Sequence, residues 1–96
     1  MTYEWDAKKA KVNRRKHRIS FEDAATVFLD PLALTFSDPD HSTGEEREIT
    51  IGRSGSQQVV FVSHCQRGDR VRIISARKTT RRERKQYEEG IDEGNE

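Results

Sequence analysis

The stretch that decides the fold, residues 59–76, reads VVFVSHCQRGDRVRIISA. Two runs rich in β-branched residues, 59–65 and 70–76, are separated by the segment 66–69, which contains one glycine. β-Branched residues favour strands, and a short connection with glycine favours an antiparallel hairpin. The stretch therefore predicts two paired strands.

The pairing of these strands predicts two faces. If the segment 66–69 forms the turn, Cys65 lies opposite Arg70, and side chains that pair across strands share a face. The face expected under the helices carries Val60, Val62, His64, Val71 and Ile73. The other face carries Phe61, Ser63, Cys65, Arg70 and Arg72. Its two arginines suit a phosphate-binding surface, but strand arginines also keep an uncovered face soluble.

Two helices are predicted before the sheet. Asp6 is a suitable N-cap for a helix that continues to about residue 16. Ser20 precedes Asp23 by three residues and opens a second helix, which ends at residue 30 because the residue before Pro31 avoids helical geometry. The second helix carries one apolar stripe, made of Phe21, Ala24, Ala25 and Phe28.

Further strands and a last helix complete the prediction. Strands are expected at 2–5, 32–36 and 47–52, and Thr80 with Glu83 forms a capping box for a helix that ends at Glu89. The only large apolar residue of this helix is Tyr87. Packing does not explain such a helix, so it is either a solvated end or a surface that presents arginines and Tyr87 to a ligand.

Together these elements predict an α+β fold with two N-terminal helices, a twisted antiparallel sheet of three to four strands and a C-terminal helix. A chain of 96 residues has no room for two cores, so residues 1–89 should form a single domain. Residues 90–96, GIDEGNE, are typical of an acidic, flexible tail.

Composition limits the class of protein. Charged residues make up 36% of the chain and hydrophobic residues 31%. No apolar run approaches the roughly 20 residues of a membrane span, and the N-terminus lacks the apolar segment of a secretion signal. Cys65 is the only cysteine, which excludes an internal disulfide and fits a reducing compartment. We therefore expect a cytoplasmic protein without membrane association.

The net charge of +1 hides separate basic and acidic blocks. Residues 8–18 carry seven bases and no acid, and residues 67–85 carry nine bases against two acids. Twelve of the 18 bases are arginine, the side chain suited to bidentate phosphate contacts. The two blocks predict a face that binds a polyanion, although charge runs are also typical of solvated surfaces.

Four stretches in the same chain carry a family resemblance: EWD at 4–6, RKHRISFEDAATVFLDPLA at 15–33, GEEREITIG at 44–52 and RGDRVRIISARKTTRRERKQYEE at 67–89. They resemble the BrnT family, ribonuclease toxins of type II toxin–antitoxin systems with a RelE-like fold. One departure is Arg18, where the family usually has glycine. The resemblance implies cleavage of messenger RNA that arrests translation. It also implies a hetero-oligomer with a ribbon-helix-helix antitoxin of the BrnA type, and operator DNA binding only through that complex.

RNA cleavage without a metal needs a proton acceptor, a proton donor and fixed cations around the phosphate. We assign the phosphate contacts to Arg70, Arg72 and Arg77. Tyr87, assisted by Glu83 one turn earlier, is the candidate that orients a base or takes part in proton transfer. RelE-like toxins combine arginines with a C-terminal aromatic or acid–base residue, so the resemblance favours the same assignment.

His17, which matches a histidine of the family, is a further catalytic candidate, although a helix C-terminus also favours histidine through the dipole. The arginines predicted to bind RNA are Arg47, Arg67, Arg81, Arg82 and Arg84. The histidines and Cys65 show no metal-ligand spacing, so we expect no metal and no cofactor. Two other classes of function stay open: a nucleic-acid-binding module without catalysis, and a protein-interaction subunit whose basic face docks an acidic partner.

Overall fold

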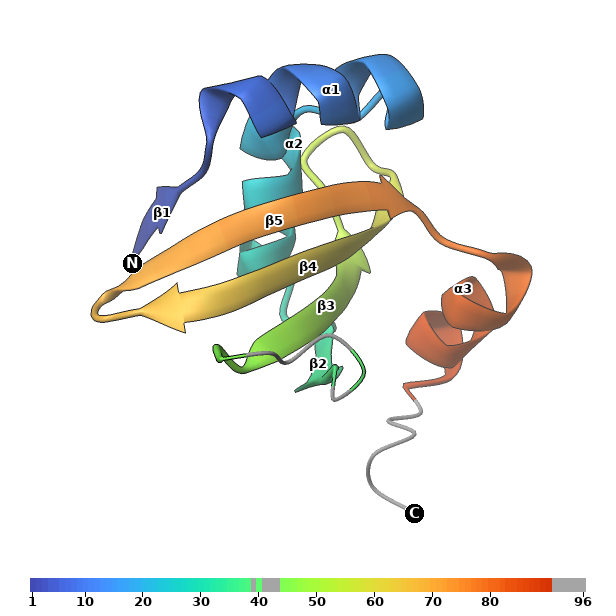
Figure 1. The fold of residues 1–96 in the computed structure, drawn as a ribbon. Coiled ribbons are helices and arrows are strands. Elements are labelled where there is room, and N and C mark those ends of the chain that lie inside the picture. Colours follow the sequence, from blue (N-terminus) through green and yellow to red (C-terminus); the bar gives the residue numbers. More distant parts are fainter. Residues whose placement is uncertain (39, 41–43, 91–96) are drawn as a thin grey trace.

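The computed structural model describes residues 1–38, 40 and 44–90. The elements follow in the order β1 (Thr2–Glu4), α1 (Ala7–His17), α2 (Phe21–Ala25), the 3₁₀ helix η1 (Thr26–Leu29), β2 (Leu34–Ser37), β3 (Arg47–Arg53), β4 (Val59–Arg67), β5 (Arg70–Lys78) and α3 (Arg81–Glu89). The strands form one sheet in the order β1-β5-β4-β3-β2, with α2 behind it and α1 along β5 (Figure 1). The α+β class and the order of the elements agree with the prediction.

Two details of the predicted sheet are wrong. The sheet has five strands rather than three to four, and it is mixed rather than wholly antiparallel. β1 pairs in parallel with β5, with Thr2 opposite Arg70 and Glu4 opposite Arg72. The short N-terminal strand was expected, but its partner lies 68 residues away along the chain, a distance that local patterns do not encode.

The first core lies between the sheet and the helices α1, α2 and η1. All residues predicted for the helix-covered face of the hairpin are buried: Val60, Val62, His64, Val71 and Ile73. Phe21 and Ala24 of α2 are fully buried against this face, and Ala25 and Phe28 pack at its margin, which confirms the predicted stripe. The helix changes from α to 3₁₀ geometry at Thr26, so the single predicted element is divided in two.

The hairpin register differs from the predicted one by two residues. The turn consists of Gly68 and Asp69 alone, so that Arg67 lies opposite Arg70. Gly68 takes a φ of +62°, which glycine adopts without strain. Because the shift is two residues, the two faces near the turn are those predicted, although the individual pairs are not.

A β-bulge interrupts the β4–β5 pairing further along. Its extra residue is Ile74 of β5, which lies between the partners of Ser63 and His64. The alternation of side chains shifts by one at the bulge. Ala76 is therefore buried in the first core, and Arg77 lies on the opposite face of the sheet.

The three predicted helix caps are present. The Asp6 carboxylate accepts from two backbone N–H groups, Ser20 accepts from the backbone of the second helix, and Thr80 with Glu83 forms a complete capping box. The first helix ends at Arg18, which takes the left-handed conformation with a φ of 61°. This is the position where the family usually has glycine, and the left-handed region explains that preference.

Candidate active site

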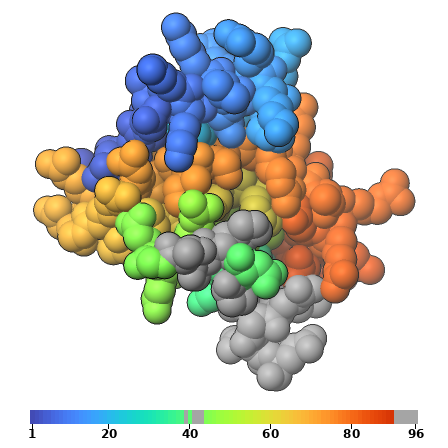
Figure 2. All heavy atoms as spheres, viewed as in Figure 1, coloured from blue at the N-terminus to red at the C-terminus, as the bar shows by residue number. Residues whose placement is uncertain are grey.

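The sheet face opposite the first core carries a pocket over β3, β4 and β5. Figure 2 is drawn from the side of this face, because α2 lies behind the sheet in the same view (Figures 1 and 2). The pocket has a volume of about 380 Å³ and is lined by Asp38, Arg47, Ile49, Phe61, Ser63, Ser75 and Arg77. Two arginines from different strands line one concave surface, an arrangement that can hold a phosphate group.

Arg77 is fixed in this pocket by two neighbours. Its Nη1 and Nη2 lie 2.8 Å and 2.9 Å from the two carboxylate oxygens of Glu83, a bidentate ion pair. Its guanidinium carbon lies 3.8 Å from the centre of the Phe61 ring. A bidentate pair and a ring contact together hold the guanidinium plane in one orientation, which leaves little ordering to be done when an anion binds.

Glu83 connects this arginine to the start of α3. Its Oε1 also accepts from the Thr80 backbone N–H at 2.8 Å. Burial raises the pKa of the Glu83 carboxyl, but hydrogen bonds from Arg77 and the Thr80 backbone outweigh burial, and the pKa lies below its ordinary value. Glu83 is therefore ionised at neutral pH and can accept a proton but has none to donate.

Tyr87 lies in a second core rather than in the solvent, so the expectation that packing does not explain α3 is wrong. Tyr87 is 8% exposed and packs with Ile49, Ile51 and Val59, next to Phe61. Its hydroxyl donates to Asp30 Oδ2 at 2.5 Å. Burial, followed by this hydrogen bond to Asp30, raises the pKa of Tyr87. The ring holds α3 on the sheet, and its hydroxyl holds α3 to the end of η1.

The structure does not bring the three arginines predicted for the phosphate together. Arg70 is exposed beside the hairpin turn, and Arg72 donates to Glu4 of β1 at 2.9 Å. A strand rises about 3.3 Å per residue, so Arg72 and Arg77 are separated by roughly 15 Å along β5. Arg77 instead shares its pocket with Arg47, which was predicted only as an RNA contact.

The other arginines predicted to bind RNA lie outside the pocket. Arg67 forms a bidentate pair with Glu45 near the hairpin turn, with both N–O distances at 3.0 Å. Arg81, Arg82 and Arg84 are exposed on α3, and Arg84 lies 3.5 Å from Glu88. These side chains surround the open face at two separate places, the hairpin turn and α3.

His17 lies next to the pocket, in a groove between α1 and β5. Ser75 lines both the groove and the pocket, so the two are adjacent. Sequence reasoning missed the residue that fixes this groove, Asn13, which is 7% exposed. Its amide donates to the carbonyls of Ile19 at 3.1 Å and Ala76 at 2.9 Å, and its oxygen accepts from the Ala76 N–H at 3.1 Å.

A sequence signal for Asn13 does exist. Asparagine is a poor helix former, because its side chain competes for backbone hydrogen bonds. In α1 it stands among alanines and long basic residues that favour helices. A lone asparagine in such a helix indicates a hydrogen bond to another part of the fold.

The described residues contain neither a cluster of metal ligands nor a membrane-spanning helix. No group of three or more His, Cys, Asp or Glu side chains in residues 1–38, 40 and 44–90 could hold a metal ion. His64 is buried, its Nε2 lies 2.7 Å from Thr50 Oγ1, and burial lowers its pKa to about 4. None of the helices described is long and apolar enough to cross a membrane. His41, one of the three histidines considered as metal ligands, lies outside the described residues.

Comparison with known proteins identifies the family. Residues 5–83 match the family described as "Ribonuclease toxin, BrnT, of type II toxin-antitoxin system". The crystal structure of the Brucella abortus ribonuclease toxin BrnT is similar in fold, with a TM-score of 0.64 and 21% sequence identity, over 84% of this chain and 100% of that one. These matches define the class: a toxin of a type II toxin–antitoxin system. Within that class the chain belongs to the BrnT family of ribonuclease toxins, as its four stretches predicted.

A second kind of relative matches a shorter segment. Over 56 residues, 58% of this chain, the sequence is 30% identical to ankyrin repeat domain-containing protein 17 of Homo sapiens and of Mus musculus. The chain spans only 2% of the length of these curated relatives.

Proposed function

We propose that this protein cleaves messenger RNA in the cytoplasm at the Arg47–Arg77 pocket, without a metal ion, and so arrests translation. The observation that carries the proposal is the fixed guanidinium of Arg77 beside Arg47 in one concave site. Cations held in place before the substrate arrives stabilise the extra charge of a phosphorane at little reorganisation cost. The arrangement therefore supports phosphodiester cleavage better than static binding.

The reaction needs two proton transfers as well as cations. The 2′-oxygen loses a proton and attacks phosphorus, while the 5′-oxygen leaves and gains a proton. We assign the phosphate to Arg47 and Arg77. Glu83, ionised beside Arg77, is a candidate acceptor, and His17 in the adjoining groove is a candidate donor because an imidazolium N–H can donate a proton. Tyr87, whose hydroxyl is committed to Asp30, becomes a positioning residue in this proposal.

The antitoxin is proposed to be a ribbon-helix-helix protein of the BrnA type that covers the open sheet face. An antitoxin bound over the arginines would exclude RNA sterically and would neutralise the positive charge that attracts it. RNA and antitoxin should then compete, and RNA affinity should fall steeply with salt. Operator DNA would be bound only by the toxin–antitoxin complex.

The test compares two arginines of the same strand. Arg77→Ala should slow RNA cleavage by about 10²–10³-fold, the cost of one preorganised contact to the transition state. Arg70→Ala removes the same side chain from the exposed turn, outside the pocket, and should change the rate less than about threefold. Cleavage by the parent protein should persist in EDTA. Equal losses in the two variants, or cleavage abolished by EDTA, would contradict the proposal.

A nucleic-acid-binding module without catalysis is the alternative for the same pocket. In that case the parent protein would bind RNA with the steep salt dependence of phosphate contacts and leave it intact. Intact RNA after prolonged incubation with purified parent protein would therefore favour the alternative.

A further inference from the structure

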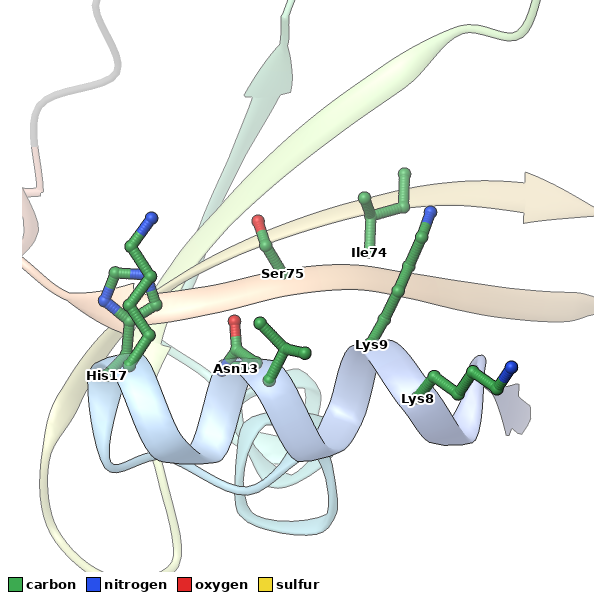
Figure 3. A pocket seen from close by; sticks show the side chains of 8 residues that line it. Lys8, Lys9, Asn13, His17, Ile74 and Ser75 are labelled. Carbon is green, nitrogen blue, oxygen red and sulfur yellow. The ribbon is translucent and has the colours of Figure 1, made fainter.

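We infer that the groove between α1 and β5 is a second RNA subsite, which binds the sugar–phosphate backbone of nucleotides beside the cleavage position. The inference rests on the proposed function, because it extends the same substrate beyond the pocket. The groove has a volume of about 350 Å³. Lys8, Lys9, Lys16 and His17 of α1 line one side, and Ile74 and Ser75 of β5 line the other (Figure 3).

The charge of α1 is uncompensated within the described residues. The helix contains five lysines and arginines besides Lys8 and Lys9, counting Arg18 at its C-cap, and it contains no acid. None of the described acidic side chains forms an ion pair with these bases. By contrast, Arg67, Arg72 and Arg77 each hold a carboxylate. An uncompensated cationic helix attracts a polyanion over several ångströms of solution.

The floor of the groove is apolar. A ligand held by charge alone would gain nothing from such a floor, so the floor indicates a ligand with an apolar part. Val12 is 59% exposed on α1, and Ile74, the extra residue of the β-bulge, is half-buried opposite it. Figure 3 shows Lys9 and His17 reaching from α1 toward β5 on either side of Asn13. A nucleotide combines a charged phosphate with the less polar surface of ribose and base, so it fits both parts of this lining. Without an aromatic platform, binding should depend little on base identity.

The groove adjoins the proposed catalytic pocket at Ser75, which lines both. An RNA chain whose phosphate lies between Arg47 and Arg77 would therefore bring a neighbouring nucleotide to the groove at Ser75. In the space-filling view the blue side chains of α1 stand directly above the orange strand β5 (Figure 2). Asn13 fixes the distance between helix and strand through both backbone groups of Ala76, the residue between Ser75 and Arg77. This adjacency favours RNA over an acidic protein segment as the occupant.

The opposite side of α1 supplies a matched control. Lys11, Arg14 and Arg15 line a second depression together with Arg18, and no described residue of another element contributes to it. It lacks both the apolar floor and the connection to Ser75. Variants on the two sides therefore remove equal charge from the same helix but only one of them changes the groove.

The experiment compares the K8Q/K9Q/K16Q variant with the K11Q/R14Q/R15Q variant. Glutamine favours helices nearly as well as lysine, and all six residues are exposed, so both variants should keep the parent's melting temperature. The probe is a fluorescent 12-nucleotide RNA with 2′-O-methyl groups that prevent cleavage. The groove variant should raise its Kd by about 10–100-fold and reduce the slope of log K against log salt by about 2. The control variant should change the Kd less than about threefold.

The outcomes separate this inference from the proposed function. Equal losses in both variants would mean unspecific attraction and would overturn the subsite. If the groove variant bound RNA as tightly as the parent, the subsite would also be overturned, whether or not the variant lost antitoxin binding. Failure of the proposed function has a different signature: the parent protein then leaves unmodified RNA intact. A parent that cleaves RNA, together with a groove variant that loses affinity for the longer RNA, supports both.

Discussion

α1 and α3 are both highly charged helices that pack on the sheet, α1 against β5 and α3 against β3, but they are attached to it in different ways. α3 carries its own large apolar residue, Tyr87, and its first turn holds the Arg77 side chain through Glu83. α1 has no large buried apolar residue, and its single buried residue is Asn13, which hydrogen-bonds to the β5 backbone. α3 therefore orders the Arg77 side chain, whereas α1 holds a charged surface in place.

The same difference is visible in their charges. The arginines around α3 are arranged with carboxylates, as in the Arg77–Glu83 and Arg84–Glu88 pairs. Pairing reduces the field around an arginine but fixes its geometry. α1 keeps its bases apart from the described acids, so it produces a stronger field with less fixed geometry. A count of bases along the sequence does not distinguish these two uses.

The largest expected effect concerns the attachment of α1. Asn13→Ala removes three hydrogen bonds and leaves both backbone groups of Ala76 without their partner. The free energy of unfolding should fall by about 3 kcal/mol, measured by urea denaturation. Val12→Ala, at an exposed site of the same helix, should cost about 0.5 kcal/mol or less. A similar small cost for Asn13→Ala would mean that other contacts hold α1.

Tyr87→Phe tests the attachment of α3 and the role of Tyr87 together. Loss of the hydroxyl removes a hydrogen bond to the ionised Asp30, so stability should fall by about 1.5–2 kcal/mol. Phenylalanine keeps the packing, and RNA cleavage should stay within about twofold of the parent at a temperature where the variant is folded. A loss of cleavage of 10²-fold or more, with unchanged stability, would return Tyr87 to proton transfer.

The first turn of α3 has two functions: it caps the helix, and it holds Arg77 by an ion pair. Variants at Thr80 and Glu83 distinguish these functions. Glu83→Gln can still accept from the Thr80 backbone, but it no longer holds Arg77 by charge and no longer supplies the proposed proton acceptor, so cleavage should fall about 10²-fold or more. Thr80→Ala breaks the cap and keeps the ion pair. It should cost about 1 kcal/mol of stability and leave cleavage unchanged. Equal cleavage by both variants would show that the Arg77–Glu83 pair has no part in catalysis.

The smallest effect is expected at the end of α1. Arg18 takes a left-handed conformation that glycine adopts without strain, so Arg18→Gly should stabilise the protein by about 0.5–1 kcal/mol despite the greater freedom of the unfolded chain. Arg15→Gly, inside the same helix, should destabilise it by about 1 kcal/mol. A lower melting temperature for Arg18→Gly would indicate that the arginine side chain contributes contacts of its own.

Local patterns predicted most of the fold. Caps depend on residues within one helical turn, so Asp6, Ser20 and Thr80 were readable from the sequence. The stripe of α2 and the alternation of the hairpin likewise identified the first core. The parallel position of β1 and the bulge were not predicted, because both depend on contacts between distant segments. The two-residue turn was missed because one glycine in the segment 66–69 is compatible with a four-residue loop as well as with a two-residue turn.

The candidate site was predicted less well, for a related reason. Sequence patterns indicate that a strand carries arginines but not which carboxylate each one meets. Arg72 meets Glu4 from the N-terminal strand, and Tyr87 meets Asp30 from the end of η1. These partners decide which side chains are structural. Arg77 and Glu83 were both named as site candidates, but the ion pair between them was not predicted.

The bulge at Ile74 makes the position of Arg77 depend on the number of residues in β5. If all residues of β5 paired without the bulge, strict alternation from Ile73 would turn Arg77 toward the first core and expose the position of Ala76. Deletion of Ile74 itself would instead remove the bulge and keep Arg77 on the open face, because Ser75, Ala76 and Arg77 would then continue the alternation from Ile73. During divergence the bulge residue should therefore accept substitution or loss, whereas alignments of relatives should carry no gap of one residue between the bulge and Arg77.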